Sequence, residues 1–261
     1  MNFSSILLTG GKSKRFGPNK VKILSGRVPL VAEQTVKLGF FTREVIVSTS
    51  PENKGFLKNV MDEINGYVRA LETPDYFKLP EIRVVLDDNI TRTSLQGIGP
   101  VAGIYTGLKE SANKMVLVMA SDMPLISYRL LQFLTRTAKQ EYSKDAVIIR
   151  HKKGIETLCG IYSKKCIKII EEGILKGIYK ISDILKGLEV RWIVTEELER
   201  EGIDQFNFFN INSGKDIEEY VNILKRGLCD YGTHNLHSRS GQEWKGYFFR
   251  GVGKETAKEK I

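Results

Sequence analysis

The 261-residue sequence lacks three features that would assign it to a membrane or secretory class. No apolar run approaches the roughly 20 residues that a membrane-spanning helix needs. No basic segment precedes the apolar run near the N-terminus, so the sequence predicts no signal peptide. Cysteine is rare. Because Cys159, Cys166 and Cys229 fall in or near apolar segments, we expect reduced thiols in a cytoplasmic protein rather than a disulfide framework.

Histidine is equally scarce, which limits the catalytic mechanisms that the sequence can support. His151, His234 and His237 lie outside the strand-end positions 10–11, 48–50, 87–88 and 122, so no Ser-His-Asp triad can be argued. Cys229 and the last two histidines have the spacing C-x4-H-x2-H without a clear fourth ligand, which disfavours structural zinc.

The residues that are abundant indicate a globular protein with acidic partners. A hydrophobic fraction of 41% can fill a sizeable core, and the length suits one large α/β domain with an appendage. The formal net charge of +9 favours nucleotides, phosphorylated small molecules or nucleic acid as partners, without choosing among them.

Segments with strand and helix character alternate along the chain. Predicted strands fall at residues 3–8, 44–50, 82–86, 115–120, 146–150, 158–162 and 190–194. Predicted helices fall at residues 29–40, from 51 onward, and at 100–111, 127–140, 164–188 and 215–225. The pattern predicts an α/β fold with a doubly wound, mostly parallel sheet and helices on both faces.

Composition changes near Gly227, which divides the chain into a domain, residues 1–227, and an extension, residues 228–261. From Lys225 onward there are eight Lys or Arg against four Asp or Glu, an excess of four positive charges. The extension is also rich in aromatic residues. We expect it to pack on the domain, to bind a partner or to attract an acidic substrate, and an extension without function is the alternative.

A glycine-rich, basic loop follows the first predicted strand. Gly10 and Gly11 allow a sharp turn and a close approach of the backbone to a ligand. Backbone N–H groups in such a turn can bind an anion, and Arg15 and Lys20 add charge against phosphate oxygens. An ordinary turn with solvated cations is the alternative, because such loops are weakly specific.

Carboxylates follow two other predicted strands, whose carboxyl ends should meet at one edge of the sheet. Asp122 comes directly after an apolar strand, where a carboxylate requires solvent, a partner or a metal. A turn or helix-capping Asp is the alternative, but the glycine loop nearby favours magnesium shared with phosphates. Asp87 and Asp88 point to opposite faces if they continue their strand, and we expect Asp88 to face the ligand.

Asparagines recur shortly before the last predicted helix. Asn207, Asn210 and Asn212 alternate with apolar residues, and a period of two would place the last two on one face. Neutral amides can donate and accept hydrogen bonds in a phosphate or metal site. Turn chemistry before a helix capped by Ser213 explains the same residues equally well.

Four segments resemble, in order, the motifs of the molybdenum cofactor guanylyltransferases. LLTGGKSKRFGPNK resembles L-A-G-G-x-S-x-R-M-G-x-x-K, and GPVAGI resembles GPLAG. SDMP resembles C-D-x-P, and FFNINSGKDIEEY resembles F-x-N-I-N-T-P-E-D-L. The match covers residues 3–224. Its first motif is shared with other nucleotidyltransferases, so the closing motif discriminates better.

The resemblance implies a Rossmann-like nucleotidyltransferase that transfers GMP from GTP to the phosphate of molybdenum-bound molybdopterin, with Mg²⁺ as cofactor and pyrophosphate as product. A phosphate nucleophile is already ionised, so no strong base is needed. Lys20, Arg15 and Asp122 are the candidate catalytic residues, and Asp122 the metal ligand. The implied nucleotide-binding residues are Leu8, Thr9, Gly10, Gly11, Lys20, Ser50, Asp88 and Asp122. The implied residues for the pterin substrate are Asn210 and Asn212.

The sequence departs from the family pattern at several positions. Thr9 replaces the usual Ala, Asn19 stands where an Asp often precedes the Lys, and Ser50 stands where an Asn can contact the nucleotide. Glu156 and Thr157 lie where a His-Pro or Gln-Pro pair is common. The last departure bears on recognition of the pterin more than on nucleotide chemistry.

Two other classes of function compete with this interpretation. Within enzymes, a cytidylyltransferase acting on the same cofactor or a sugar-phosphate nucleotidyltransferase would have a similar loop. A non-catalytic nucleotide- or RNA-binding module would suit the basic aromatic extension, but the presence of Lys20 and Asp122 argues against it. The expected partners are GTP and a molybdopterin-type cofactor. A molybdoenzyme or a cofactor-delivery protein is open, a membrane is not expected and nucleic acid is disfavoured.

Overall fold

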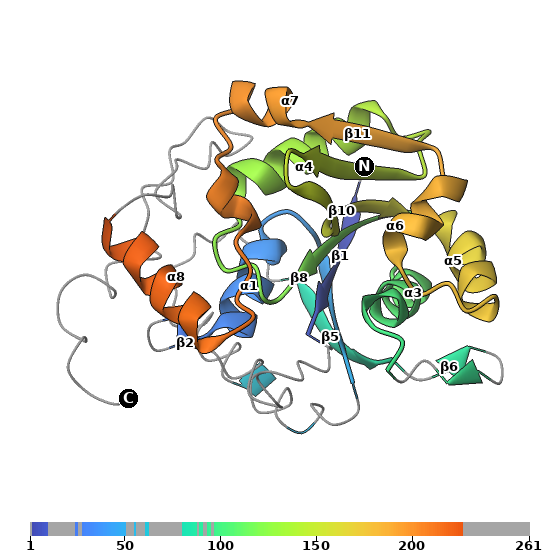
Figure 1. The fold of residues 1–261 in the computed structure, drawn as a ribbon. Coiled ribbons are helices and arrows are strands. Elements are labelled where there is room, and N and C mark those ends of the chain that lie inside the picture. The colour runs from blue at the N-terminus through green and yellow to red at the C-terminus, as the bar shows by residue number, and fades with distance from the viewer. Residues whose placement is uncertain are drawn as a thin grey trace.

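A seven-stranded sheet forms the centre of the computed structural model (Figure 1). The structure describes residues 2–9, 24, 25, 28–50, 55, 61, 62, 80–87, 89, 90, 93, 94 and 97–226. The sheet has the strand order β11-β9-β10-β8-β1-β4-β5. Its strands are β1 (Phe3–Leu8), β4 (Glu44–Thr49), β5 (Glu81–Leu86), β8 (Met115–Ala120), β9 (Ala146–His151), β10 (Gly154–Ser163) and β11 (Val190–Val194). Two ribbons lie outside it, β2 (Leu24–Ser25) with β3 (Val28–Pro29), and β6 (Asn89–Ile90) with β7 (Thr93–Ser94).

Strand direction confirms the prediction of a mostly parallel sheet. β10 runs antiparallel to both of its neighbours, β8 and β9, whereas the other adjacent pairs of this sheet are parallel. β9 therefore runs in the same direction as β8 and β1. The turn that joins β9 to β10 consequently lies at the edge where the parallel strands end.

Helices cover both faces of the sheet, as the doubly wound pattern predicts (Figure 1). On one face lie α1 (Leu30–Gly39), α4 (Tyr128–Gln140) and α7 (Thr195–Arg200). On the other lie α3 (Pro100–Glu110), α5 (Cys166–Leu175) and α6 (Ile181–Ile184). Because side chains alternate along a strand, Leu7 joins the first core and Ile6 the second, and the strands read as continuous apolar runs.

The GPVAGI segment shows why glycine is needed where α3 begins. Gly99, just before the helix, has φ of 86°, a left-handed conformation that favours glycine. Gly103 lies so close to the sheet that an added Cβ would stand 2.6 Å from Leu8 Cδ2 and 2.6 Å from Ser48 Oγ. The motif thus brings the first turn of α3 directly against the ends of β1 and β4.

The structure differs from the predicted elements in three places. The helical stretch predicted over 164–188 is divided, since α5 ends before Gly177 (φ 76°) and α6 is followed by a short 3₁₀ helix, Leu185–Gly187. The short helix α7 was not predicted. The asparagine segment begins as a 3₁₀ helix, Gln205–Phe208, and continues without a strand, so the period-two argument does not apply to it.

The last helix of the described chain, α8 (Gly214–Arg226), lies to one side of the sheet (Figure 1). Its Tyr220 and Ile223 form a separate small core with Leu30, Leu125 and Ile211. This core joins the beginning of α1 to the segments around Leu125 and Ile211. The predicted extension, residues 228–261, lies outside the described residues and stays a prediction.

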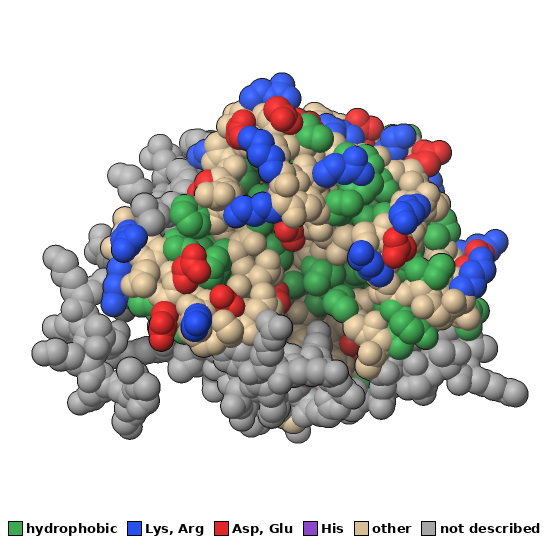
Figure 2. Space-filling view, in the orientation of Figure 1, with side chains coloured by type: hydrophobic (Ala, Val, Ile, Leu, Met, Phe, Trp, Pro, Cys, Tyr) green, Lys and Arg blue, Asp and Glu red, His purple; other side chains and the backbone are tan. Residues whose placement is uncertain are grey.

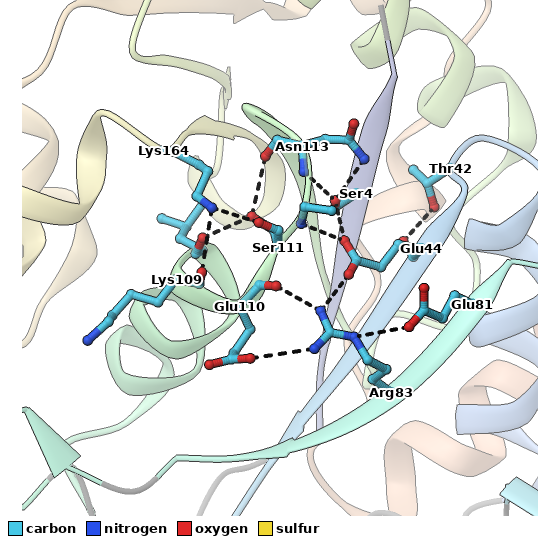
Figure 3. Close-up of polar contacts among 12 residues, drawn as sticks. Ser4, Thr42, Glu44, Glu81, Arg83, Lys109, Glu110, Ser111, Asn113 and Lys164 are labelled. Atoms are coloured by element: carbon cyan, nitrogen blue, oxygen red, sulfur yellow. Dashed lines mark hydrogen bonds and ion pairs between the residues drawn. The ribbon is translucent and has the colours of Figure 1, made fainter.

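Polar groups at the amino ends of the strands form a hydrogen-bonded cluster (Figure 3). This amino-end cluster comprises the Ala112 N–H and the side chains of Ser4, Glu44, Glu81, Arg83, Glu110 and Asn113. The buried Glu44 carboxylate accepts hydrogen bonds from Ser4 Oγ at 2.5 Å, from the Ala112 N–H at 2.9 Å and from Arg83 Nη2 at 2.5 Å. Burial opposes ionisation of Glu44, but these hydrogen bonds together outweigh it and lower its pKa below the ordinary value.

Two cysteines occupy the core, as the sequence predicts. Cys159 and Cys166 are free and buried, and burial raises the pKa of both thiols, that of Cys166 to about 12. Cys229 lies outside the described residues. Among the helices that the structure describes, none is long and apolar enough to cross a membrane.

Candidate functional site

The carboxyl ends of β1, β4 and β5 are joined by short polar contacts. Thr9 follows β1 and donates both its N–H and its hydroxyl to the Ser48 carbonyl, at 2.9 Å each. Ser48 in turn donates its hydroxyl to Asp87 Oδ1 at 2.5 Å. The hydroxyl that Thr9 adds to the family pattern is therefore used to fix the exit of the chain from β1.

Asp122 lies in a turn that follows β8, next to the end of β1. The preceding residue, Ser121, donates its N–H to the Leu8 carbonyl at 3.0 Å, which extends the parallel pairing of the two strands. The Ile211 N–H donates to the Asp122 carbonyl at 2.8 Å. Residues almost 90 positions apart thus meet at this turn, and the asparagine segment lies beside the predicted metal ligand.

Buried polar side chains hold the rest of the turn, residues 121–127, which we call the Asp122 turn. Gln34 Nε2 donates to the Met123 and Pro124 carbonyls at 3.2 and 3.3 Å. Lys37 Nζ donates to the Ile126 carbonyl at 2.9 Å. Asn207 Oδ1 accepts the Ser127 N–H at 2.8 Å. Two α1 side chains and that of Asn207 therefore fix the backbone of this turn.

The donor set at the Asp122 turn fits a shared cation better than an ion held by protein alone. Within the described ranges, no group of three or more His, Cys, Asp or Glu side chains could hold a metal ion. Magnesium is usually bound by one or two carboxylates together with substrate phosphates and waters. A single strand-end carboxylate such as Asp122 matches that pattern.

The predicted site residues divide into three groups. The structure brings Leu8, Thr9, Ser50 and Asp122 to one edge of the sheet. The second group is the pair of asparagines, whose surroundings differ. Asn210 is half-buried and its Nδ2 donates to the Phe208 carbonyl at 3.1 Å. Asn212 is exposed and donates its backbone N–H to Asp216. The third group lies outside the described residues and comprises Gly10, Gly11, Arg15, Lys20 and Asp88.

A cavity of about 690 Å³ lies near the Asp122 turn, to which it is connected through Asn210 and its neighbour Ile211. Its wall combines the β9–β10 turn, α7 and the segment that leads to Asn210, which is the neighbour of Ile211. The aromatic lining residues are Phe206, Phe208 and Phe209, and Lys152 and Lys153 add positive charge from the turn. Glu156, Glu199, Asp204 and Glu219 also line it, so the size and mixed lining suit a small organic ligand with polar groups of both kinds.

Two lining residues that the sequence analysis did not assign form a pair inside this cavity. His151 Nε2 lies 2.8 Å from Glu156 Oε1, with side chains 11% and 21% exposed. The His151 ring also stacks on Phe208, with centroids 4.7 Å apart and planes 13° from parallel. No sequence pattern indicates this stack, because its two rings are separated by 57 positions.

Charge is mixed on the face of the molecule shown in Figure 2. Acidic side chains are interspersed with basic ones over this face, so the excess of positive charge does not form a single field there. A long basic stripe of the kind that tracks a nucleic-acid backbone is not seen on the described part of this face.

Comparison with known proteins gives a family match over most of the chain. The model of the MobA-like NTP transferase domain matches residues 5–191. A protein of Pelotomaculum thermopropionicum named "Probable molybdenum cofactor guanylyltransferase" is 27% identical over 241 residues, 92% of this chain and 97% of the relative. A "Molybdenum cofactor guanylyltransferase" of Desulfosudis oleivorans is 26% identical over 226 residues, 86% of this chain and 96% of the relative.

Solved structures share the fold. The molybdopterin-guanine dinucleotide biosynthesis protein A of Archaeoglobus fulgidus superimposes with a TM-score of 0.64 at 22% identity, covering 86% of this chain and 100% of that one. The 4-diphosphocytidyl-2C-methyl-D-erythritol synthase of Anaerococcus prevotii gives a TM-score of 0.60 at 15% identity, covering 86% and 99%. At these identities the likeness establishes the architecture alone.

Proposed function

Because the chain belongs to the MobA-like NTP transferase family and is thus a nucleotidyltransferase, we propose that it transfers GMP from GTP to the phosphate of molybdenum-bound molybdopterin, releasing pyrophosphate. The observation that carries the proposal is the match, over 92% of the chain, to a relative named for that reaction. The closing asparagine motif, which lies beside Asp122, supports the same choice of acceptor.

The nucleotide belongs at the edge formed by the ends of β1, β4 and β8. Leu8, Thr9 and Ser50 would contact it there, together with Gly10, Gly11 and Asp88. Arg15 and Lys20 would neutralise its phosphates. Asp122 would hold a divalent cation such as Mg²⁺, which would supply positive charge to offset that of the phosphates.

The chemistry requires positioning and charge neutralisation more than proton transfer. A phosphate oxygen of the acceptor attacks the α-phosphate of GTP, and the bond to the pyrophosphate leaving group breaks. Two anions must therefore approach in line, which demands fixed groups on both sides of the reacting phosphorus atom. The clamped backbone of the Asp122 turn supports such fixed placement, because buried Gln34 and Asn207 restrain it.

The acceptor would enter from the side of the cavity at the β9–β10 turn. Asn210 lines the cavity, and the next residue contacts the Asp122 backbone, so an acceptor in the cavity would lie beside the metal ligand. This arrangement supports a role for Asn210 in holding the acceptor. Asn212, exposed on the other side of Ile211, would instead order the segment.

Release of pyrophosphate tests the proposal directly. The full chain is incubated with each of the four nucleoside triphosphates, with and without molybdopterin carrying molybdate, and pyrophosphate is measured. We expect release from GTP alone among the four, and only when the acceptor is present. Equal or faster release from CTP would favour a cytidylyltransferase, and release with a sugar phosphate as acceptor would contradict the assignment.

A further inference from the structure

The β9–β10 turn brings one carboxylate into the cavity beside the Asp122 turn. Glu156 lies on β10 opposite Ile149 of β9, two positions from the register pair of Gly154 and His151. Both side chains of the His151–Glu156 pair line the cavity. Glu156 is also the residue at which the sequence departs from the His-Pro or Gln-Pro pattern of the family.

Hydrogen bonds fix the tautomer of His151. The Lys153 backbone N–H donates to His151 Nδ1 at 3.1 Å, so Nδ1 carries no proton. The ring proton therefore resides on Nε2 and is donated to Glu156 Oε1. With its ring stacked on Phe208, the histidine is restrained at both nitrogens and on one face. It consequently holds the Glu156 carboxylate in one orientation.

Glu156 keeps acceptor capacity for a ligand. Among the described residues its hydrogen bond is the one that Oε1 receives from His151, and Oε2 receives none. The carboxylate stands beside a lining that includes Phe206, Phe208 and Phe209. A planar ring that packs against these aromatic residues would present its edge to the carboxylate.

Resting on the proposed function, we propose that Glu156, oriented by His151, recognises the amino-substituted edge of the pterin ring of the acceptor. The 2-amino-4-oxo edge of a pterin offers two adjacent N–H donors, which match the two oxygens of a carboxylate. A ring edge with a carbonyl in place of the amino group would match it less well. Glu156 is then a specificity-determining residue and His151 a positioning residue.

A purely structural role is the competing explanation, since the pair also joins the two strands of the turn. Ligand preference separates the two explanations. Pterin and lumazine have the same ring system, but lumazine carries a carbonyl in place of the 2-amino group. A pair that only stabilises the turn has no reason to prefer pterin, whereas recognition of the N–H edge requires it.

The test is a fluorescence titration of the full chain with pterin and with lumazine, without nucleotide. We expect pterin to bind about tenfold more tightly than lumazine, as one hydrogen bond to a charged acceptor implies. Glu156→Gln should reduce that ratio to near one, because an amide accepts and donates on either edge. Glu199→Gln removes the same charge from an exposed residue of the cavity rim and should leave the ratio unchanged.

Each outcome decides the inference separately from the proposed function. Equal affinity of the unaltered chain for pterin and lumazine overturns it, whatever the variants do. A ratio in Glu156→Gln equal to that of the unaltered chain also overturns it, with circular dichroism melting to confirm that both are folded. Failure of GTP-dependent pyrophosphate release, with the pterin preference intact, would contradict the proposed function and leave this recognition site standing.

Discussion

The two ends of the same sheet are held together in different ways. At the amino end, polar groups gather around the buried Glu44 carboxylate, which accepts from the Ser4 and Arg83 side chains and from the Ala112 N–H (Figure 3). At the carboxyl end, Gln34 and Asn207 bind the backbone of the Asp122 turn instead. The first arrangement uses its polar groups for stability. The second fixes the backbone of the Asp122 turn, so that the Asp122 side chain is held in place for a ligand.

The largest effect should come from the carboxyl end. Asp122→Asn keeps the size of the side chain and removes its charge. We expect a loss of several kcal/mol of transition-state stabilisation, with an unchanged melting temperature. Turnover is measured across a magnesium titration. Asp183→Asn, an exposed carboxylate on α6 paired with Lys186, is the matched control. Turnover of Asp122→Asn within a few-fold of the unaltered chain would remove Asp122 from the mechanism.

At the amino end we expect the opposite result, a loss of stability without a loss of activity. Glu44→Ala leaves the Ala112 N–H and the buried Ser4 hydroxyl without their acceptor, and Arg83 keeps only its ion pairs with Glu81 and Glu110. Unfolding in urea should show a loss of about 3 kcal/mol, the cost of the hydrogen bonds and the ion pair that the carboxylate makes. The kcat/KM for GTP, measured well below the melting temperature, should stay within twofold. A large fall in kcat/KM would mean that the two ends are coupled.

Gln34 tests whether the backbone of the Asp122 turn must be held. Gln34→Met keeps the buried volume but removes the donor to the Met123 and Pro124 carbonyls. We expect about 1–2 kcal/mol of lost stability and, unlike the amino-end variant, a fall in kcat. Asp122→Asn in the same background should add less than it does alone, since both act on one turn. Strictly additive effects on kcat would contradict that coupling.

The smallest effect is a dependence of stability on pH. The pKa of Glu44 is lowered in the folded chain from its ordinary value of 4.5, so folding favours the ionised carboxylate. The resulting stabilisation is complete above pH 4.5 and is lost as the pH falls through the folded-state pKa. Urea unfolding between pH 7 and pH 3 should therefore show Glu44→Gln losing less stability on acidification than the unaltered chain. An equal loss of stability in the variant and in the unaltered chain would mean that other carboxylates cause the acid sensitivity.

Periodicity was sufficient to predict the fold, and the ends of the predicted strands indicated which candidate residues would share one edge of the sheet. The continuous apolar runs around Ile6 and Val118 specify strands covered on both sides, and Asp122 follows one of them directly. Contacts between distant positions were not accessible in this way. Gln34 reads as a polar position of an amphipathic helix, and its role depends on a turn 89 residues away. Likewise, the His151–Phe208 stack exists only because α7 and the following segment return to the β9–β10 turn.

Local conformation accounts for the remaining differences. Gly177 ends α5 by adopting a positive φ that the apolar spacing of residues 164–188 does not reveal. Asn210 and Asn212 would share a face in a strand, but the chain forms none after the 3₁₀ helix, and Asn210 is half-buried whereas Asn212 is exposed. Thr9 departs from the Ala of the family pattern, and its hydroxyl adds a second hydrogen bond to the Ser48 carbonyl beside that of its N–H.

The reversed direction of β10 has a consequence for how this fold can diversify. In a wholly parallel sheet each crossover carries the chain back to the amino edge, whereas β9 and β10 double back at the carboxyl edge itself. The tip at His151 to Gly154 is therefore a short loop that can lengthen, shorten or change residues without disturbing the register of β8, β1, β4 and β5. Under the proposed function, changes at this tip would alter the acceptor side of the site and leave the nucleotide side unchanged.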